Sequence, residues 1–151
     1  MRTGYDVRPA STFERSAVEQ VVAEAYQPWA SVLGFRPPPM DADYGYRIAA
    51  GQVYVTGKRR VDGVAVLVDE HDCLVVENVA VRPALQGQGI GRALLGFAER
   101  EAQRRGLPAL RLYTHEQMTS NLALYTSLGY VETGREPVRA GYRVHLRKII
   151  P

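Results

Sequence analysis

The chain has 151 residues, of which 46% are apolar and 23% are charged. This length and composition are typical of one globular domain, here spanning residues 1–151, and they exclude a wholly disordered chain. No apolar run approaches the roughly 18 residues that a membrane-spanning helix needs, and the first residues hold no apolar signal segment. We therefore expect a cytoplasmic protein without a membrane partner.

The charge of the chain selects no partner by itself. Nineteen Lys and Arg residues against sixteen Asp and Glu residues give a net charge of +3. Because the cations are spread along the chain, we expect no nucleic-acid partner, whereas such an excess suits an anionic small molecule equally well. The three histidines lack ligand spacing, so no metal site is expected. The single cysteine, Cys73, is interpreted as a small buried apolar residue.

The first half of the chain predicts a strand, a long helix and a proline-rich loop. Asp6–Pro9 alternates like a strand, and Ser11 followed by Glu14 has the spacing of a capping box. Apolar residues then recur every three or four positions over Phe13–Ala25, which predicts an amphipathic helix that ends before Pro28.

Strand-forming segments follow the loop at Pro37–Pro39 and a weaker helix predicted over Asp41–Ala49. Three segments are rich in β-branched residues and are separated by turn signals: Gln52–Thr56, Val61–Val68 and Cys73–Val81. This pattern predicts an antiparallel meander.

The second half begins with a glycine-rich stretch and the clearest helix of the chain. That helix has its apolar face over Ile90–Ala102 and closes at Gly106. The later expected elements are a strand, a short helix and two strands: Ala109–Tyr113, Ser120–Ser127, Tyr130–Thr133 and Tyr142–Leu146. The order predicts an α/β (α+β) protein with a mixed, largely antiparallel sheet and flanking helices.

The glycine-rich stretch is suited to holding an anion. Three glycines recur at every second position between a strand and a helix: Gly87, Gly89 and Gly91. Glycine lets successive N–H groups turn toward a ligand, and the helix N-terminus adds about half a positive charge. The stretch is not a Walker A loop, because Phe97 stands where the lysine belongs, and Arg92 replaces the last glycine of the dinucleotide fingerprint.

Two motifs resemble those of one family. Gln86-x-x-Gly89-x-Gly91, after a strand and before a long helix, resembles the acyl-CoA loop of the GNAT superfamily of N-acyltransferases. Asn121-x-x-x-Tyr125-x-x-x-Gly129-Tyr130 is similar to a later segment of that family, and the element order matches over nearly the whole chain. The resemblance implies an enzyme that moves an acetyl group from acetyl-CoA to a primary amine by direct transfer in a ternary complex.

The resemblance also implies where the coenzyme binds. Backbone N–H groups of the glycine loop would hold its pyrophosphate, and its pantetheine arm would lie between two parallel strands that splay apart. The implied binding residues are Val79, Ala80, Val81, Gln86, Gly87, Gln88, Gly89, Ile90, Gly91, Arg92, Asn121 and Tyr125. For Asn121, a role as a cap or polar residue at the start of a helix is an equal alternative.

Two side chains are candidates for catalysis. The resemblance implies that Tyr125 is the acid near the sulfur and that Glu77 activates the amine through water. The alternatives are a tyrosine packed under Tyr130 and a glutamate that is merely paired or exposed. Alternation along the strand predicts that Glu77 shares a face with Val75 and Val79.

The acceptor is expected to be a small-molecule or peptide amine. The resemblance assigns its cleft to the region between the first two helices, which holds Trp29, Phe35, Met40 and Tyr44. His115, which follows Tyr113 and Thr114, is a further candidate for the same cleft. The aromatic residues alternatively cover a core, and the histidine alternatively lies in a loop. Pairing of the terminal strands would allow a homodimer. The competing function is a non-catalytic acyl-CoA-binding sensor or assembly module.

Overall fold

The computed structural model describes residues 4–151, and the first three residues of the expected domain lie outside this range. The strands are β1 (Val7–Pro9), β2 (Val53–Thr56), β3 (Gly63–Glu70), β4 (Cys73–Val81), β5 (Ala109–His115), β6 (Val131–Val138) and β7 (Gly141–Ile149). The α-helices are α1 (Arg15–Leu33), α2 (Tyr44–Ala49), α3 (Ile90–Arg104) and α4 (Thr119–Ser127), and short 3₁₀ turns cover Thr12–Glu14, Pro38–Asp41 and Pro83–Leu85. No helix among residues 4–151 combines the length and apolarity needed to cross a bilayer.

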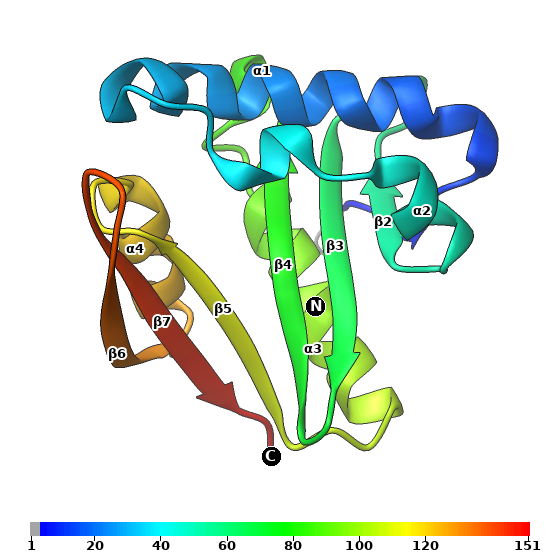
Figure 1. Cartoon of the computed structure of the whole chain (residues 1–151). Helices are drawn as coiled ribbons and strands as arrows, with labels where there is room; N and C mark the ends of the chain where they lie inside the picture. The colour runs from blue at the N-terminus through cyan, green and yellow to red at the C-terminus, as the bar shows by residue number, and fades with distance from the viewer. Residues whose placement is uncertain (1–3) are drawn as a thin grey trace.

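The strands form one sheet in the order β1-β2-β3-β4-β5-β7-β6. Every neighbouring pair is antiparallel except β4 and β5, so the mixed, largely antiparallel sheet and the meander of β2, β3 and β4 are confirmed. The parallel pair is matched at two positions, Leu74 with Leu110 and Val75 with Arg111. Beyond them β4 and β5 diverge toward α1 and α4 (Figure 1). The sheet is therefore open between β4 and β5, where a ligand is expected to lie between two splayed parallel strands.

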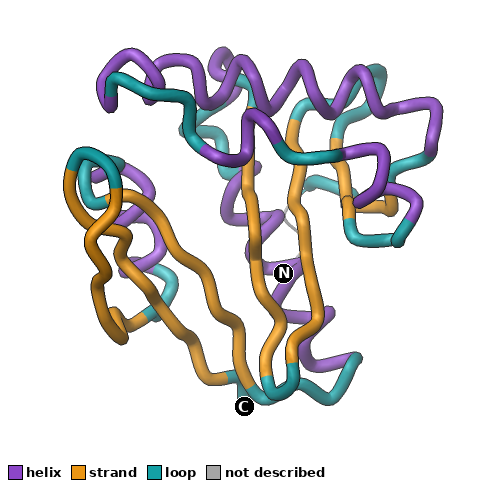
Figure 2. Tube along the Cα trace, in the orientation of Figure 1, coloured by secondary structure: helices purple, strands orange, loops and turns teal. Residues whose placement is uncertain are grey.

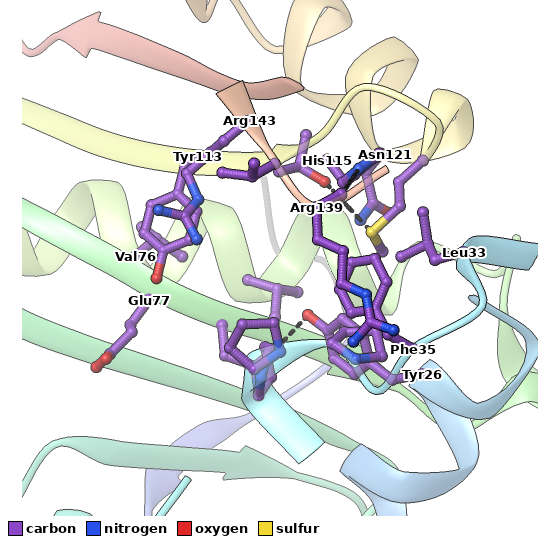
Figure 3. Close-up of a pocket in the computed structure, with 18 of the residues that line it drawn as sticks. Tyr26, Leu33, Phe35, Val76, Glu77, Tyr113, His115, Asn121, Arg139 and Arg143 are labelled. Atoms are coloured by element: carbon purple, nitrogen blue, oxygen red, sulfur yellow. Dashed lines mark hydrogen bonds between the residues drawn. The ribbon is translucent and has the colours of Figure 1, made fainter. Parts of the chain in front are cut away.

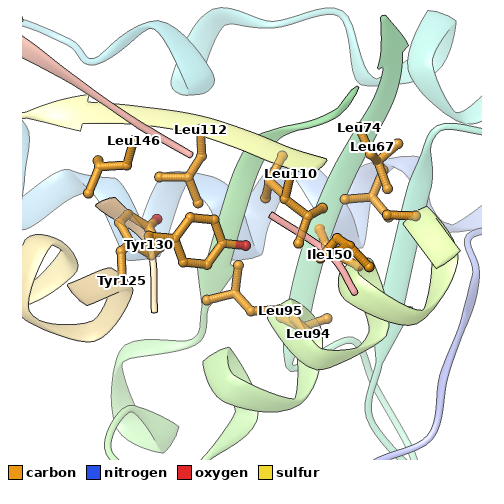
Figure 4. Close-up of a cluster of buried hydrophobic side chains, with 14 of the residues drawn as sticks. Leu67, Leu74, Leu94, Leu95, Leu110, Leu112, Tyr125, Tyr130, Leu146 and Ile150 are labelled. Atoms are coloured by element: carbon orange, nitrogen blue, oxygen red, sulfur yellow. The ribbon is translucent and has the colours of Figure 1, made fainter. Parts of the chain in front are cut away.

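Helices cover both faces of this sheet. On one face α1 and α2 bury a cluster that includes Val21, Val55 and Val64. On the other face α3 and α4 bury a larger cluster, in which leucines of the sheet meet Leu94, Tyr125 and Tyr130 (Figure 4). Burial of these two clusters holds in place the helices that flank the diverging strands.

The first helix is longer than the sequence predicts. The expected end before Pro28 is wrong, because α1 continues to Leu33. Proline lacks the N–H that would reach the carbonyl of Glu24, so one helix hydrogen bond is missing. The apolar face nevertheless continues to Leu33, and Gly34, at φ +81°, ends the helix by donating its N–H to Ala30. The added turns carry α1 across the open side of the sheet (Figure 1).

Other local expectations also change. Phe13 precedes α1 in a 3₁₀ turn and is 97% exposed, so its place on the apolar helix face was wrong. The proline-rich loop includes the turn Pro38–Asp41, and α2 starts at Tyr44 because Asp43 accepts the N–H of Tyr46. Strands β5, β6 and β7 extend beyond their predicted ends.

A β-bulge lies at Glu77. Val66 on β3 pairs with Asn78 whereas Leu67 pairs with Val76, so Glu77 is the extra residue of β4. The bulge reverses the alternation that follows it. Val79 packs in the α3 layer, whereas Val75 lies in a small cluster with Cys73. The expectation that Val75 and Val79 share one face is therefore wrong.

Candidate active site

The glycine loop presents unbonded N–H groups. Gly87 and Gly89 have φ values of +83° and +90°, a backbone region that residues other than glycine rarely adopt. Within residues 4–151 the backbone N–H groups from Gly87 to Arg92 donate to no carbonyl or side chain, although Ala93 already donates to Gly89. Six successive donors at the start of a 15-residue helix form the geometry of an anion site.

These donors border a cavity of ≈ 370 Å³, here called the loop cavity. It is lined by the end of β4, the glycine loop, α4 and α1. All the expected coenzyme-binding residues line it except Gln88, whose carbonyl accepts the hydroxyl of Tyr5 at 2.8 Å. Trp29, expected beside the acceptor, lines this cavity instead, because α1 continues past Pro28.

A second cavity of ≈ 260 Å³, the acceptor cavity, lies on the other side of the gap between β4 and β5. Its walls come from these two strands, from the segment that follows α1 and from the tip of the β6–β7 hairpin (Figure 3). Phe35 and His115 line it as expected, and His115 ends β5 instead of lying in a loop. Met40 lines neither cavity, and Tyr44 is 2% exposed.

The two cavities share part of their lining. Five residues border both: Tyr26, Val79, Met118, Asn121 and Tyr125. Two ligands, one bound in each cavity, would therefore meet beside these side chains, at the junction of the two cavities.

Tyr125 occupies the junction from α4. Its side chain is 7% exposed, and burial raises the pKa of its phenol to about 12. Its ring centre lies 5.8 Å from that of Tyr130, so packing under Tyr130 and a place at the junction occur together. Tyr130 lines neither cavity.

Glu77 lines the acceptor cavity from the bulge on β4, at the end away from Phe35 and Arg139 (Figure 3), and it also lines a smaller cavity beside Arg47. Arg47 of α2 donates to its Oε1 at 2.9 Å, so the pairing alternative holds. The second oxygen, Oε2, is buried and has no hydrogen-bond partner among the described residues. A buried acceptor without a partner is costly unless a ligand or water satisfies it.

Asn121 is the third residue of α4, whose N-cap is Met118. Its amide nitrogen lies 3.5 Å from the hydroxyl of Thr114 on β5, at the limit of a hydrogen bond. Asn121 is therefore a polar residue at the start of the helix, as the alternative expects, although it does not cap it, and it also lines both cavities.

Several residues at the site carry no local sequence signal. Tyr26 donates to the side chain of Asn78 at 2.6 Å, and Asn78 donates to Tyr44 at 3.0 Å. Arg139 and Arg143 reach the acceptor cavity from the β6–β7 hairpin. They are assembled by long-range topology, which spacing within the sequence does not reveal.

Residues remote from the junction are also placed. Cys73 is 2% exposed at the start of β4, packed with Val75 and Ala109, and it lines neither cavity. In the described part of the chain, no three His, Cys, Asp or Glu side chains are grouped to hold a metal ion.

Sequence comparisons relate the chain to acetyltransferases. The family model described as "Acetyltransferase (GNAT) family" matches residues 18–130. The mycothiol acetyltransferase of Arthrobacter sp. (strain FB24) is 30% identical over 106 residues, which make up 70% of this chain and 26% of that protein. The ribosomal protein bS18-alanine N-acetyltransferase of Escherichia coli (strain K12) is 44% identical over 55 residues, 36% of this chain and 37% of that protein. The chain thus matches well under half the length of each relative.

The fold is shared with solved structures of similar length. The crystal structure of the PaiA N-acetyltransferase from Thermoplasma acidophilum in complex with coenzyme A has a TM-score of 0.80 to this chain. The two are 14% identical, and the match covers 94% of this chain and 98% of the other. At that identity the likeness shows the fold alone, and it confirms the GNAT-like architecture.

Proposed function

The chain belongs to the acetyltransferase (GNAT) family, and on that premise we propose that it transfers an acetyl group from acetyl-CoA to a primary amine within a ternary complex. The observation that carries this proposal is the junction of the loop cavity and the acceptor cavity at Tyr125 and Asn121. A donor and an acceptor bound side by side can react directly, because correct placement supplies much of the barrier lowering.

The residues present fit an acyl-CoA donor. Its diphosphate suits the unbonded N–H groups from Gly87 to Arg92, and the positive end of α3 adds to that attraction. Beyond Val75 the edge of β4 that faces β5 has no strand partner. The amide-bearing arm of the donor can pair with this edge as an added strand does.

The acceptor amine must lose a proton before it attacks. A lysine-like amine with a pKa near 10.4 needs roughly 4.6 kcal/mol to become neutral at pH 7. The free Oε2 of Glu77 is the candidate that accepts this proton, directly or through a water molecule. Arg47 holds the carboxylate through its other oxygen and so orients it.

The amine nitrogen then forms a bond to the acetyl carbonyl carbon. The carbonyl oxygen becomes an oxyanion, for which a backbone N–H of Val79 or a neighbour on the open edge of β4 is the proposed donor. When the carbon–sulfur bond breaks, its electron pair stays on sulfur as a thiolate. Tyr125, which burial keeps protonated, donates its phenolic proton there. The phenolate regains a proton from the nitrogen, which thereby becomes the amide nitrogen of the product.

Direct transfer is favoured over a covalent enzyme intermediate. A two-step route through a thiol would need a cysteine within reach of the donor, and Cys73 is buried away from both cavities. The proposed reaction therefore requires donor and acceptor to be present together.

Two measurements test the proposal. Because a ligand that binds only the folded state stabilises it by RT ln(1 + [L]/Kd), acetyl-CoA should raise Tm in a concentration-dependent way. Thiol release in the presence of amine acceptors should fall at least about tenfold in Tyr125→Phe, with the affinity for acetyl-CoA nearly unchanged.

Tyr130→Phe is the matched control. It removes the same hydroxyl from a neighbouring buried tyrosine that borders neither cavity. Its turnover should stay close to that of the parent. An unchanged Tm at millimolar acetyl-CoA would overturn the proposal, and donor binding without transfer to any amine would instead identify a binding module.

A further inference from the structure

The acceptor cavity is poor in negative charge. Among the described residues that line it, Glu77 is the one carboxylate, and Arg47 already pairs with it. Two arginines, Arg139 and Arg143, line the same cavity. An acceptor with several ammonium groups would meet net repulsion there, because like charges raise the energy of a bound state.

Arg139 is held at the cavity with its donors free. Its guanidinium carbon lies 5.1 Å from the centre of the Phe35 ring, within the range of a cation–π contact. Phe35 in turn packs edge-on against His115, which contacts the carbonyl of Arg139 at 3.1 Å. Within residues 4–151 the guanidinium forms no ion pair or hydrogen bond. Figure 3 shows it extended beside Phe35.

Arg143 adds a second positive charge from the same hairpin. Its guanidinium lies 4.8 Å from the ring centre of Tyr113, and one of its nitrogens donates to Glu136 at 3.1 Å. Glu136 also contacts His145 at 2.8 Å, so this carboxylate is shared. The charge of Arg143 is thus only partly matched at the cavity.

We propose that the acceptor is a primary amine that also carries a carboxylate, which Arg139 binds. This inference rests on the proposed function and names its substrate class. A planar guanidinium with five donors binds a carboxylate through two parallel hydrogen bonds. The ring of Phe35 orients that fork in advance, and Glu77 at the other end of the cavity is left for the amine.

Two sources provide this chemistry, a free amino acid and the N-terminus of an acidic peptide. One pair of probes is L-alanine and L-alaninamide, which differ in the carboxylate alone. The other pair is two C-terminally amidated tripeptides, Ala-Glu-Glu and Ala-Lys-Lys. We expect kcat/KM to be at least about tenfold higher for the carboxylate member of one pair or both, and the pair with the larger ratio identifies the source.

Two variants test whether Arg139 is the source of the preference for a carboxylate. Arg139→Gln should lower kcat/KM for the preferred carboxylate probe about tenfold while leaving the uncharged or cationic probe unchanged. Arg59→Gln, in the exposed turn between β2 and β3, makes the same charge change away from the cavity and should leave the ratio unchanged. Added salt should lower the ratio in the parent protein, because it screens an exposed guanidinium.

Failure of this inference differs from failure of the proposed function. A protein that binds acetyl-CoA and acetylates the lysine peptide as well as the glutamate peptide, and alaninamide as well as alanine, overturns the inference alone. So does a carboxylate preference that persists in Arg139→Gln with an unchanged Tm. A protein that does not bind acetyl-CoA overturns both.

Discussion

Tyr125 shows how burial suits one side chain to its proposed task. Burial in the cluster under α3 and α4 removes its phenol from water and raises its pKa to about 12. A phenol with that pKa is a weak acid in solution. At the junction of the two cavities it nevertheless stays protonated throughout the working pH range and can donate to a thiolate.

The pH profile should reflect this. Deprotonation of Tyr125 removes the proposed donor only as the pH approaches 12, whereas the acceptor amine loses its proton at lower pH. We therefore expect kcat/KM, measured from pH 6 to 10, to rise without a descending limb. A descending limb between pH 8 and 10 that is missing in Tyr125→Phe would show that the phenol titrates far below this value.

The sequence predicts those site residues that belong to local motifs. The glycine loop, Asn121 and Tyr125 lie within short segments whose spacing has a physical meaning. Glu77 could be named, but its partner Arg47 lies 30 positions away and the bulge that orients it has no local signal. Arg139 reaches the cavity through the pairing of β6 with β7, which residue spacing cannot specify.

At the scale of elements, the position of α3 depends on a close approach to β3. A Cβ built on Gly63 would lie 2.7 Å from Cγ2 of Ile90 and 3.1 Å from Cδ1 of Leu94. Ile90 is the first residue of α3, directly after the glycine loop. The contact therefore links the packing of the sheet to the N-terminus that faces the loop cavity.

Replacing this glycine should weaken the fold. Gly63→Ala forces α3 away from β3, and we expect it to lower the free energy of unfolding by about 1–3 kcal/mol in urea titrations. Gly96→Ala, in the middle of α3, is the matched control. Its Cβ would lie 3.5 Å from the nearest atom, at the flexible tip of Arg100, so it should raise stability by about 0.5–1 kcal/mol. Equal effects of the two changes would contradict the close approach.

The elements themselves are predictable where periodicity is strong. The apolar face of α3 and the three strands of the meander form as predicted, although β3 spans Gly63–Glu70 instead of Val61–Val68, because local pattern and packing agree there. Pro28 shows the opposite case. The hydrogen bond that proline cannot donate predicts an early end to the helix. In the structure, tertiary packing of residues up to Leu33 outweighs the loss of that hydrogen bond.

At the scale of the whole molecule, one departure from regular pairing creates both cavities. Strands β4 and β5 pair at Leu74 and Val75 and then separate, while β5 continues alongside β7 (Figure 2). The bulge at Glu77 lies where β4 leaves its parallel neighbour. The loop cavity and the acceptor cavity open on either side of this gap and meet at Tyr125.

Element order predicts this architecture, but the shape of the gap requires the structure. The order of strands and helices restricts the sheet to a small number of topologies. The extent of the parallel pairing, and hence the width of the opening, depends on packing between distant segments such as α1 and the β6–β7 hairpin. No local pattern in the sequence records these contacts.

A titration with coenzyme A, followed through the backbone amide resonances of the protein in solution, tests the central claim most directly. The account predicts that the largest saturable shifts fall on Gly87–Arg92, because these N–H groups gain the diphosphate as their partner. Smaller shifts should extend along Val79–Val81. Resonances of the loop that stay unmoved at millimolar coenzyme, or shifts confined to another surface, would contradict it.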